Sequence, residues 1–147
     1  MWLPQRPYLV TGTLRDQVTY PQLCGFQKRF DARILSCLEK AGVAKLAESG
    51  AGLDRVHDEW DDVLSGGERQ RIGFARLFWH APKFAILDEA TSACNAEGET
   101  ALYTTCVNEG ITLLSIAHRM ELRRFHQAEL ALVGDGSGAW TLTTLTH

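Results

Sequence analysis

The sequence predicts an α/β domain built on a parallel sheet, and three stretches indicate this fold. Phe84–Leu87 is continuously apolar and ends in the carboxylates of Asp88 and Glu89, which is typical of a strand buried on both faces of a parallel sheet. Ile111–Ile116 has the same character, and the residues between the two runs predict an amphipathic helix. A strand, a helix and a second strand in this order favour a right-handed crossover within one sheet.

The residues before this sheet predict one short strand followed by two helices. Trp2–Leu3 has the character of a strand end, and the prolines of Pro4–Tyr8 then interrupt regular structure. Thr13 is expected to cap a short helix, because an acidic residue follows at capping-box spacing. Asp31 is expected to cap a second helix. Trp60, in an acidic stretch further on, is interpreted as a packing anchor rather than as a ligand contact.

Val63–Arg71 predicts a tight turn that opens directly into a helix. Ser65 is a favourable N-cap residue, and Glu68 lies at capping-box spacing from it. Gly66 and Gly67 leave the backbone free to approach a ligand closely and to adopt a positive φ. The free N–H groups and the positive dipole end of a helix start suit an anion such as a phosphate. The alternative is a well-capped turn without a ligand.

Acidic residues mark the carboxyl end of the first long strand, which is where open α/β sheets bind ligands. Two buried neighbouring carboxylates, Asp88 and Glu89, are costly without a cation or a proton, and oxygen ligands favour Mg²⁺. The alternative is that the pair only caps the turn at Ala90–Ser92. His118 follows the second strand and is expected at the same sheet edge, although a lone histidine there is more often structural.

The end of the chain predicts an antiparallel hairpin. Glu129–Val133 and Ala139–Leu145 are alternating runs, and the glycine-rich segment Gly134–Gly138 joins them.

Composition limits the classes of function. At 147 residues the chain is one ordinary domain or a large part of one, and a net charge of −3 gives no electrostatic case for nucleic acid or an anionic membrane. No apolar run reaches the roughly 20 residues that span a bilayer, and no signal-peptide pattern is present. The four cysteines lack Cys-x-x-Cys spacing, which indicates reduced thiols in a cytosolic setting.

Five short pieces of the sequence occur in a fixed order. They are Gln5, Leu64–Gln70, Phe84–Glu89, Ser92–Ala93 and His118. Together they resemble the Q-loop, signature motif, Walker B motif, D-loop and H-loop of the nucleotide-binding domain of ABC transporters, over essentially the whole chain. Each piece alone is weak, whereas five in order form a specific signal.

Three further segments of the sequence are most similar to one branch of that family. Pro4–Tyr8, Gly12–Val18 and Trp60–Ser65 resemble subfamily D, the peroxisomal half-transporters for very-long-chain fatty acids and their CoA esters. The resemblance implies a parent protein that couples ATP hydrolysis to the transport of such acyl substrates across the peroxisomal membrane.

The resemblance also implies a role for each matched position. Gln5 would contact Mg²⁺ and the attacking water, and Asp88 would hold Mg²⁺ largely through water. Glu89 would orient and deprotonate the attacking water, and His118 would contact the γ-phosphate. Phosphoryl transfer needs charge neutralisation and a placed water more than a covalent nucleophile. The positions expected to bind the cofactor, an ATP held by the opposite protomer, are Leu64, Ser65, Gly66, Gly67, Glu68 and Gln70.

The implied architecture is a partial P-loop NTPase with a RecA-like parallel sheet. Residues 1–147 would form part of an ABC ATPase domain, with the Q-loop, helical subdomain and signature helix in 6–80. The Walker B, D-loop and H-loop core would occupy 81–147. ATP and Mg²⁺ would be the cofactors. The expected partners are a second nucleotide-binding domain and the transmembrane domain of a half-transporter. The expected location is the cytosolic face of the peroxisomal membrane, and nucleic acid is not expected as a partner.

Two departures from the family pattern stand out. The D-loop reads Ser92–Asn95, where most of the superfamily ends in aspartate, although subfamily D varies there. No Gly-x-x-x-x-Gly-Lys-Ser/Thr occurs in the sequence, so the Walker A half of the fold is missing from it. We therefore expect that the 147-residue polypeptide alone neither binds ATP tightly nor hydrolyses it. We also expect uncovered strand edges and apolar surface.

Two other functions stay open. A non-catalytic partner chain would lend Ser65–Gly67 to an ATP bound by a full-length subunit. A soluble ABC ATPase of DNA repair or translation is disfavoured, because the residues between Arg6 and Val63 lack sustained heptads and the chain lacks a basic nucleic-acid face.

Overall fold

A parallel three-stranded sheet lies at the centre of the computed structural model, which describes residues 1–22 and 27–146. Its order is β1 (Trp2–Leu3), β4 (Phe84–Asp88) and β5 (Thr112–Ile116). Leu3 pairs with Leu87, and Leu87 pairs with Ser115. This confirms the predicted α/β class and its parallel sheet.

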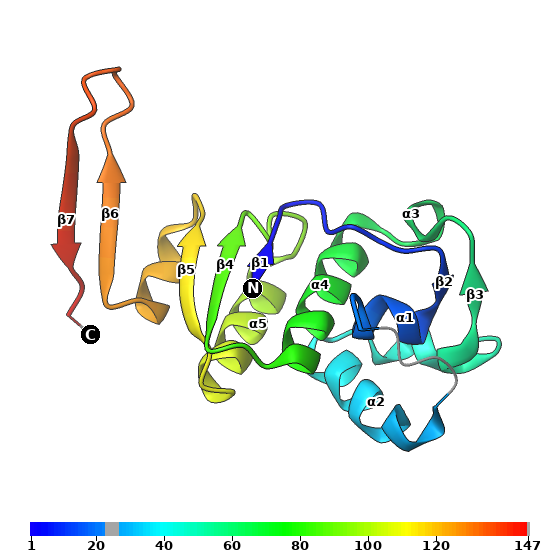
Figure 1. The fold of residues 1–147 in the computed structure, drawn as a ribbon. Helices are drawn as coiled ribbons and strands as arrows, with labels where there is room; N and C mark the ends of the chain where they lie inside the picture. Colours follow the sequence, from blue (N-terminus) through cyan, green and yellow to red (C-terminus); the bar gives the residue numbers. More distant parts are fainter. Residues whose placement is uncertain (23–26, 147) are drawn as a thin grey trace.

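Helix α5 (Ala96–Asn108) connects β4 to β5, and α4 (Gly66–His80) lies beside it (Figure 1). Every residue from Ile72 to Trp79 is buried. The reason is that α4 packs against the N-terminal segment on one side, where a Cβ at Gly73 would lie 3.1 Å from Pro7 and 3.7 Å from Leu3, and against the N-terminal helices on the other. Helix α4 is therefore the element that joins the sheet to the helical part.

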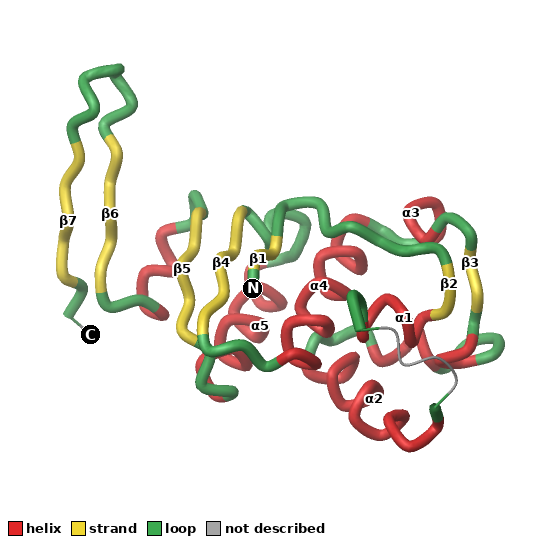
Figure 2. The backbone as a smooth tube through the Cα atoms, in the orientation of Figure 1, coloured by secondary structure: helices red, strands yellow, loops and turns green. Residues whose placement is uncertain are grey.

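The helical part contains α1 (Leu14–Thr19) and α2 (Asp31–Lys40), which both contact α4 and lie on the far side from the hairpin (Figure 2). Its smaller elements are β2 (Gly12–Thr13), the 3₁₀ turns η1 (Lys28–Phe30), η2 (Ala44–Ala47) and η3 (Gly52–Asp54), β3 (Val56–His57) and α3 (Trp60–Val63). Across residues 1–22 and 27–146, no helix is long and apolar enough to cross a membrane.

Two local predictions in this part are confirmed. Thr13 caps α1, and Asp16 closes the capping box from the other side. Trp60 is a packing anchor, because it is only 1% exposed and its Nε1 donates to the carbonyl oxygen of Gly12 at 2.9 Å. One side chain thereby ties α3 to β2.

The predicted capping role of Asp31 is wrong. The N-cap of α2 is Phe30, and the 3₁₀ turn η1 leads directly into the helix. The carboxylate of Asp31 instead accepts a hydrogen bond from the guanidinium of Arg15. Arg15 is buried and also donates to Asp54, and a buried cation requires such partners. The tertiary ion pair therefore takes the carboxylate that the local pattern assigned to the helix end.

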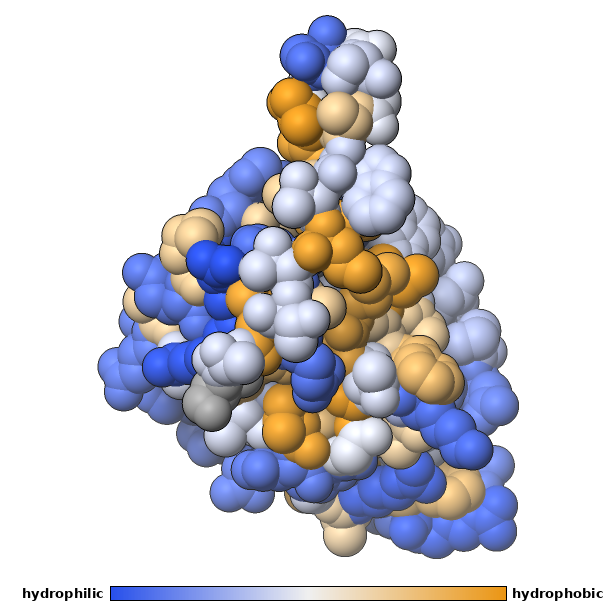
Figure 3. Space-filling view, turned by 90° about the vertical axis from the view of Figure 1, so that its left-hand side faces the viewer, coloured by the Kyte–Doolittle hydropathy of each residue, from blue (hydrophilic) through white to orange (hydrophobic). Residues whose placement is uncertain are grey.

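Strand β4 is buried on one face only and β5 is only half-buried on one face, which corrects the prediction of burial on both faces. Ala85 and Leu87 are fully buried, whereas Phe84 is 67% exposed and Leu114 is 63% exposed. In the described part of the chain, the helices cover one face of the sheet (Figure 1). The expectation of uncovered apolar surface is confirmed, and an apolar strip runs down the hairpin side of the molecule (Figure 3).

The predicted C-terminal hairpin is present as β6 (Ala128–Leu132) and β7 (Trp140–Thr144), preceded by the 3₁₀ turn η4 (Met120–Phe125). It projects away from the rest of the molecule (Figures 1 and 2). Leu132 pairs with Trp140 across the strands, and both side chains are exposed. An ion pair of 2.8 Å between Arg123 and Glu129 fixes the base of the hairpin to η4.

Replacing Ala81 with glycine is expected to stabilise the chain by about 1 kcal/mol. Ala81 is the C-cap of α4 and has a left-handed backbone with φ 42°, a conformation that costs glycine little. Urea denaturation would measure the free energy of unfolding. Ala101→Gly, at an exposed site within α5, is the control and should destabilise by a similar amount. A loss of stability in Ala81→Gly would contradict the prediction.

Candidate functional site

Three predicted catalytic residues meet at the carboxyl edge of the sheet. Gln5 follows β1, Glu89 follows β4 and His118 follows β5. The Nε2 of Gln5 donates to Glu89 Oε2 at 2.9 Å, and the Nε2 of His118 lies 2.9 Å from Glu89 Oε1. Parallel strands end at the same edge, which is why residues so distant in the chain come together. One carboxylate is thus held from both sides.

The backbone of Glu89 is left-handed, with φ 47°. Such a conformation costs a non-glycine residue about 1–3 kcal/mol and persists only where the surroundings enforce it. Here the N–H of Glu89 donates to the carbonyl oxygen of Ile116 at 2.9 Å, and its own carbonyl oxygen accepts from Gln70 Nε2 at 3.4 Å. These contacts turn the chain sharply after β4.

Asp88 is the last residue of β4 and is half-buried beside Glu89. Its carboxylate and the amide oxygen of Gln5 are hard oxygen donors of the kind that Mg²⁺ takes. In residues 1–22 and 27–146, no three or more His, Cys, Asp or Glu side chains form a group that could hold a metal ion by themselves. The donors fit a Mg²⁺ that takes its other ligands from water and phosphate oxygens, as this ion commonly does.

The predicted cap of the signature helix is confirmed. The hydroxyl of Ser65 accepts from the N–H of Glu68 and donates to Glu68 Oε2 at 2.8 Å. The same Oε2 accepts from the N–H of Ser65 at 2.8 Å. The carboxylate of Glu68 therefore completes the capping box, while Ser65 stays exposed at the helix start.

Gly66 and Gly67 do not have positive φ, which corrects the sequence-based expectation. Helix α4 already begins at Gly66, so both residues take helical angles. Their lack of a side chain serves close packing instead. A Cβ at Gly67 would lie 3.2 Å from the carbonyl oxygen of Ala93, and one at Gly66 would lie 3.4 Å from the Ala93 Cβ. The helix start and the D-loop of the same chain are thus in contact.

Two positions expected to bind the cofactor have buried side chains. Leu64 belongs to the hydrophobic core, and Gln70 is only 3% exposed. The amide of Gln70 makes hydrogen bonds within the chain, to Ser92 at 3.0 Å and from the N–H of Ala93 at 2.9 Å. A side-chain contact of either residue with a nucleotide is not supported by this conformation. The spacing of Gln70 from Phe74 along α4 could have indicated its inward direction.

A buried network that the sequence did not indicate lies behind the site. Glu99 of α5 is buried and accepts hydrogen bonds from Thr91 and from Arg119 at 3.0 Å. Arg119 also donates to the carbonyl oxygen of Cys94 at 3.1 Å. The residue after His118 is therefore fixed to the turn that follows Glu89. No local pattern in the sequence predicts a pairing across this distance.

An ion cluster connects the signature helix to the segment after Gln5. Asp61 accepts from Arg69 at 2.8 Å and from Arg6 at 3.3 Å. The hydrogen bond from Arg69 lowers the pKa of Asp61 below its usual value, and Arg6 acts in the same direction. Asp61 is therefore ionised at neutral pH and tethers both arginines.

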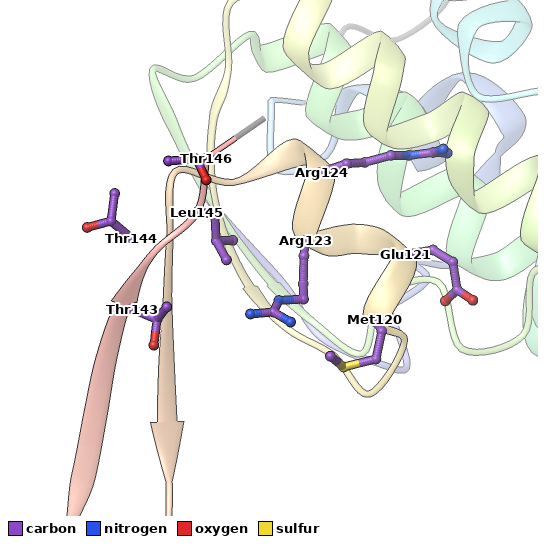
Figure 4. Close-up of a pocket in the computed structure, with 8 residues that line it drawn as sticks. All are labelled: Met120, Glu121, Arg123, Arg124, Thr143, Thr144, Leu145 and Thr146. Atoms are coloured by element: carbon purple, nitrogen blue, oxygen red, sulfur yellow. The ribbon is translucent and has the colours of Figure 1, made fainter.

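An open hollow of about 540 Å³ lies elsewhere, between η4 and the end of β7 (Figure 4). Met120 and Arg123 line it from η4, and Leu145 lines it from the C-terminal segment. None of Gln5, Asp88, Glu89 and His118 belongs to its lining. The site at the sheet edge is an exposed rim on this chain.

The three cysteines in the described part of the chain do not form a metal site. Cys37, Cys94 and Cys106 are free and buried, and burial raises the pKa of each thiol. These three are therefore protonated at neutral pH and act as core residues. Cys24 lies outside the described residues.

A parallel sheet whose edge gathers a glutamine, a carboxylate and a histidine, beside a capped glycine-rich helix, defines the class as an ABC-type nucleotide-binding domain. The family model described as ABC transporter matches residues 2–92. The chain belongs to the ABC transporter family.

Similar proteins refine this placement. The chain is 46% identical to the lysosomal cobalamin transporter ABCD4 of Mus musculus over 149 residues, which cover 99% of this chain and 24% of that protein. It is 45% identical to ATP-binding cassette sub-family D member 3 of Homo sapiens, over 99% of this chain and 22% of that protein. The chain spans about a quarter of the length of these relatives. It corresponds to part of the nucleotide-binding domain, and these relatives are members of subfamily D.

A solved structure supports the same fold. The structure of a bacterial Atm1-family ABC exporter with ATP bound superposes with a TM-score of 0.74 at 27% sequence identity. The match covers 88% of this chain and 22% of that chain.

Proposed function

We propose that this chain provides the catalytic sheet edge and the signature helix of an ATP-hydrolysing domain that powers a subfamily D transporter. The observation that carries the proposal is the Glu89 carboxylate held between Gln5 and His118 at one edge of the parallel sheet. An acidic residue with this support is suited to orient and deprotonate a water that attacks a phosphate.

The side chains at the edge divide the chemistry. Glu89 takes the proton of the attacking water on a carboxylate oxygen. Gln5 fixes the direction of this carboxylate through its Nε2 and keeps its amide oxygen for the metal. A Mg²⁺ held by Asp88 and Gln5 would neutralise phosphate charge. His118 is 85% exposed at its side chain, and its Nε2 would donate to a γ-phosphate oxygen.

The placement of the signature helix supports a composite site shared by two protomers. Ser65 is exposed at the start of α4, where backbone N–H groups and the helix dipole favour an anion. In our proposal the Ser65–Gly67 turn of one protomer contacts the γ-phosphate of an ATP that lies on the Glu89 edge of a second nucleotide-binding domain. Membership of the ABC transporter family supports this arrangement, as does the likeness to an exporter with ATP bound.

The finer part of the proposal concerns the cargo and the membrane. The sequences of Pro4–Tyr8 and Gly12–Val18 resemble those of subfamily D. This resemblance supports a peroxisomal transporter of long-chain fatty acids or their CoA esters, with this domain at the cytosolic face. A relative named as a lysosomal cobalamin transporter is equally similar, and it supports cobalamin as the alternative cargo. Uptake of labelled acyl-CoA and of labelled cobalamin by vesicles carrying the full transporter would separate the two.

ATP-dependent association tests the composite site. The purified chain is mixed with a detergent-solubilised subfamily D half-transporter that carries its own Walker A motif, and binding is followed by interferometry with and without Mg·ATP. We expect binding that requires Mg·ATP and that Gly66→Asp weakens by about tenfold or more, because the new carboxylate faces phosphate. Ala51→Asp, in an exposed loop, adds the same charge and should leave binding unchanged.

Two results would contradict the proposal. One is equal association with and without nucleotide. The other is an equal loss of association in Gly66→Asp and Ala51→Asp, which would mean that the added charge acts without regard to its position.

A further inference from the structure

Gln70 is a buried polar residue at the meeting point of the site segments. It lies in the second turn of α4 and is 3% exposed. Its Nε2 donates to the carbonyl oxygen of Gln5 and to the Ser92 hydroxyl, each at 3.0 Å. Its Oε1 accepts from the N–H of Ala93 at 2.9 Å. A buried amide is costly unless its groups are satisfied, and here each end has partners.

The segments that Gln70 joins are the ones that carry the predicted chemistry. Its contact with Gln5 fixes the backbone after β1, and its contact with the Glu89 carbonyl oxygen supports the left-handed turn after β4. Its contacts with Ser92 and Ala93 fix the D-loop. One side chain therefore bridges the segment after β1 and the segment Glu89–Ala93, which are far apart in sequence.

The same helix carries the signature turn, and a second contact couples the two. Gly67 packs so close to Ala93 that an added Cβ would lie 3.2 Å from its carbonyl oxygen. Movement of the Ser65–Gly67 turn would therefore displace Ala93, and Gln70 would pass that displacement to the backbone of Glu89.

We propose that Gln70 is a positioning residue that couples the signature turn to the Glu89 carboxylate within one chain. The inference rests on the proposed function. In the proposed dimer, the signature turn of this chain faces one of two ATP molecules and Glu89 faces the other. Gln70 would therefore transmit a movement of the signature turn at the first ATP to the Glu89 carboxylate at the second. Gln70 itself is buried and touches neither nucleotide.

The chain offers a matched control in a second buried glutamine. Gln17 is fully buried, and its amide bonds to Val10 and to the carbonyl oxygen of Thr13. It supports a loop of the helical part, and none of its hydrogen-bond partners in the described part of the chain belongs to the D-loop. Gln17→Met and Gln70→Met each remove one buried amide at similar side-chain volume, so they separate coupling from ordinary loss of stability.

Hydrogen exchange on the 147-residue chain tests the contacts without any need for catalysis. In Gln70→Met we expect the Ala93 amide to exchange about tenfold faster, because it loses its acceptor, while α2 keeps its protection. In Gln17→Met the Val10 amide should lose protection and Ala93 should keep it. Gln70→Glu keeps an acceptor for Ala93 and serves if the methionine variant fails to fold; it should retain protection at Ala93 and lose order around Gln5. Unchanged exchange at Ala93 in Gln70→Met overturns the inference.

ATP turnover tests the coupling in an exchange chimera, a subfamily D half-transporter in which this chain replaces the matching segment. We expect Gln70→Met to lower kcat by about 10- to 100-fold, as small misplacements of catalytic groups do, with the KM for ATP within about twofold. Gln17→Met should keep kcat near that of the unaltered chimera. An equal loss of kcat in both variants would mean that Gln70 is only structural. If the unaltered chimera does not hydrolyse ATP, the proposed function fails. The hydrogen-exchange measurement on the 147-residue chain still decides whether the contacts of Gln70 exist.

Discussion

Replacing Glu89 with glutamine is expected to lower ATP turnover by the exchange chimera by about 10²- to 10⁴-fold, the contribution typical of a general base. Glutamine keeps the size of the side chain and can still bond to Gln5 and His118, but it cannot take a proton from water. Steady-state phosphate release at saturating ATP measures kcat. Binding of a fluorescent ATP analogue should change by less than about threefold, because the γ-phosphate contacts remain.

The control for this prediction is another glutamate of the same chain. Glu48 is exposed in the helical part, and Glu48→Gln removes the same charge far along the chain from the sheet edge. It should keep kcat near that of the unaltered chimera. If kcat of Glu89→Gln equals that of Glu48→Gln, Glu89 is excluded as the base. A non-catalytic role for this chain would then be favoured.

Trp60→Ala is expected to destabilise the chain by about 3–5 kcal/mol, the cost of truncating a large buried aromatic side chain. Trp60 is the largest of the fully buried side chains. Its ring meets His57 edge-on with centroids 4.7 Å apart, and Arg55 stacks 5.1 Å from its centroid. The truncation also leaves the carbonyl oxygen of Gly12 without its indole donor. Urea denaturation followed by circular dichroism gives the free energy of unfolding.

Trp140 provides the matched comparison for this measurement. It lies on the hairpin and is 61% exposed, so Trp140→Ala should change the free energy of unfolding by less than about 0.5 kcal/mol. Trp60→Phe should fall between the two, since it keeps most of the apolar burial and loses one hydrogen bond of about 1–2 kcal/mol. Similar losses in Trp60→Ala and Trp140→Ala would disprove the anchoring role.

Local chemistry explains which parts of the fold the sequence could predict. The capping boxes at Thr13 and Ser65 each depend on residues within one helical turn, so their patterns are visible in a short window. The meeting of Gln5, Glu89 and His118 is not local. It was predictable because parallel strands place their carboxyl ends at one edge and because the motifs resembled a known order.

Tertiary packing explains where the sequence was misleading. The exposure of Phe84 depends on what covers the second face of the sheet, and an apolar run by itself does not contain that information. The glycine pair suggested unusual backbone angles, yet Gly67 serves its neighbour Ala93. The local sequence predicts Asp31 as the cap of the nearest helix, whereas the guanidinium of Arg15 on another helix binds its carboxylate.

The doubly held carboxylate of Glu89 sets an order of events. Gln5 contacts one oxygen of this carboxylate and His118 contacts the other, so both oxygens of the base are engaged by its own chain. An incoming phosphate offers the imidazole a more highly charged acceptor, and the departure of that ring leaves one oxygen open to a water molecule. In the proposed function, Glu89 therefore accepts a proton from water only after a nucleotide phosphate has drawn His118 away.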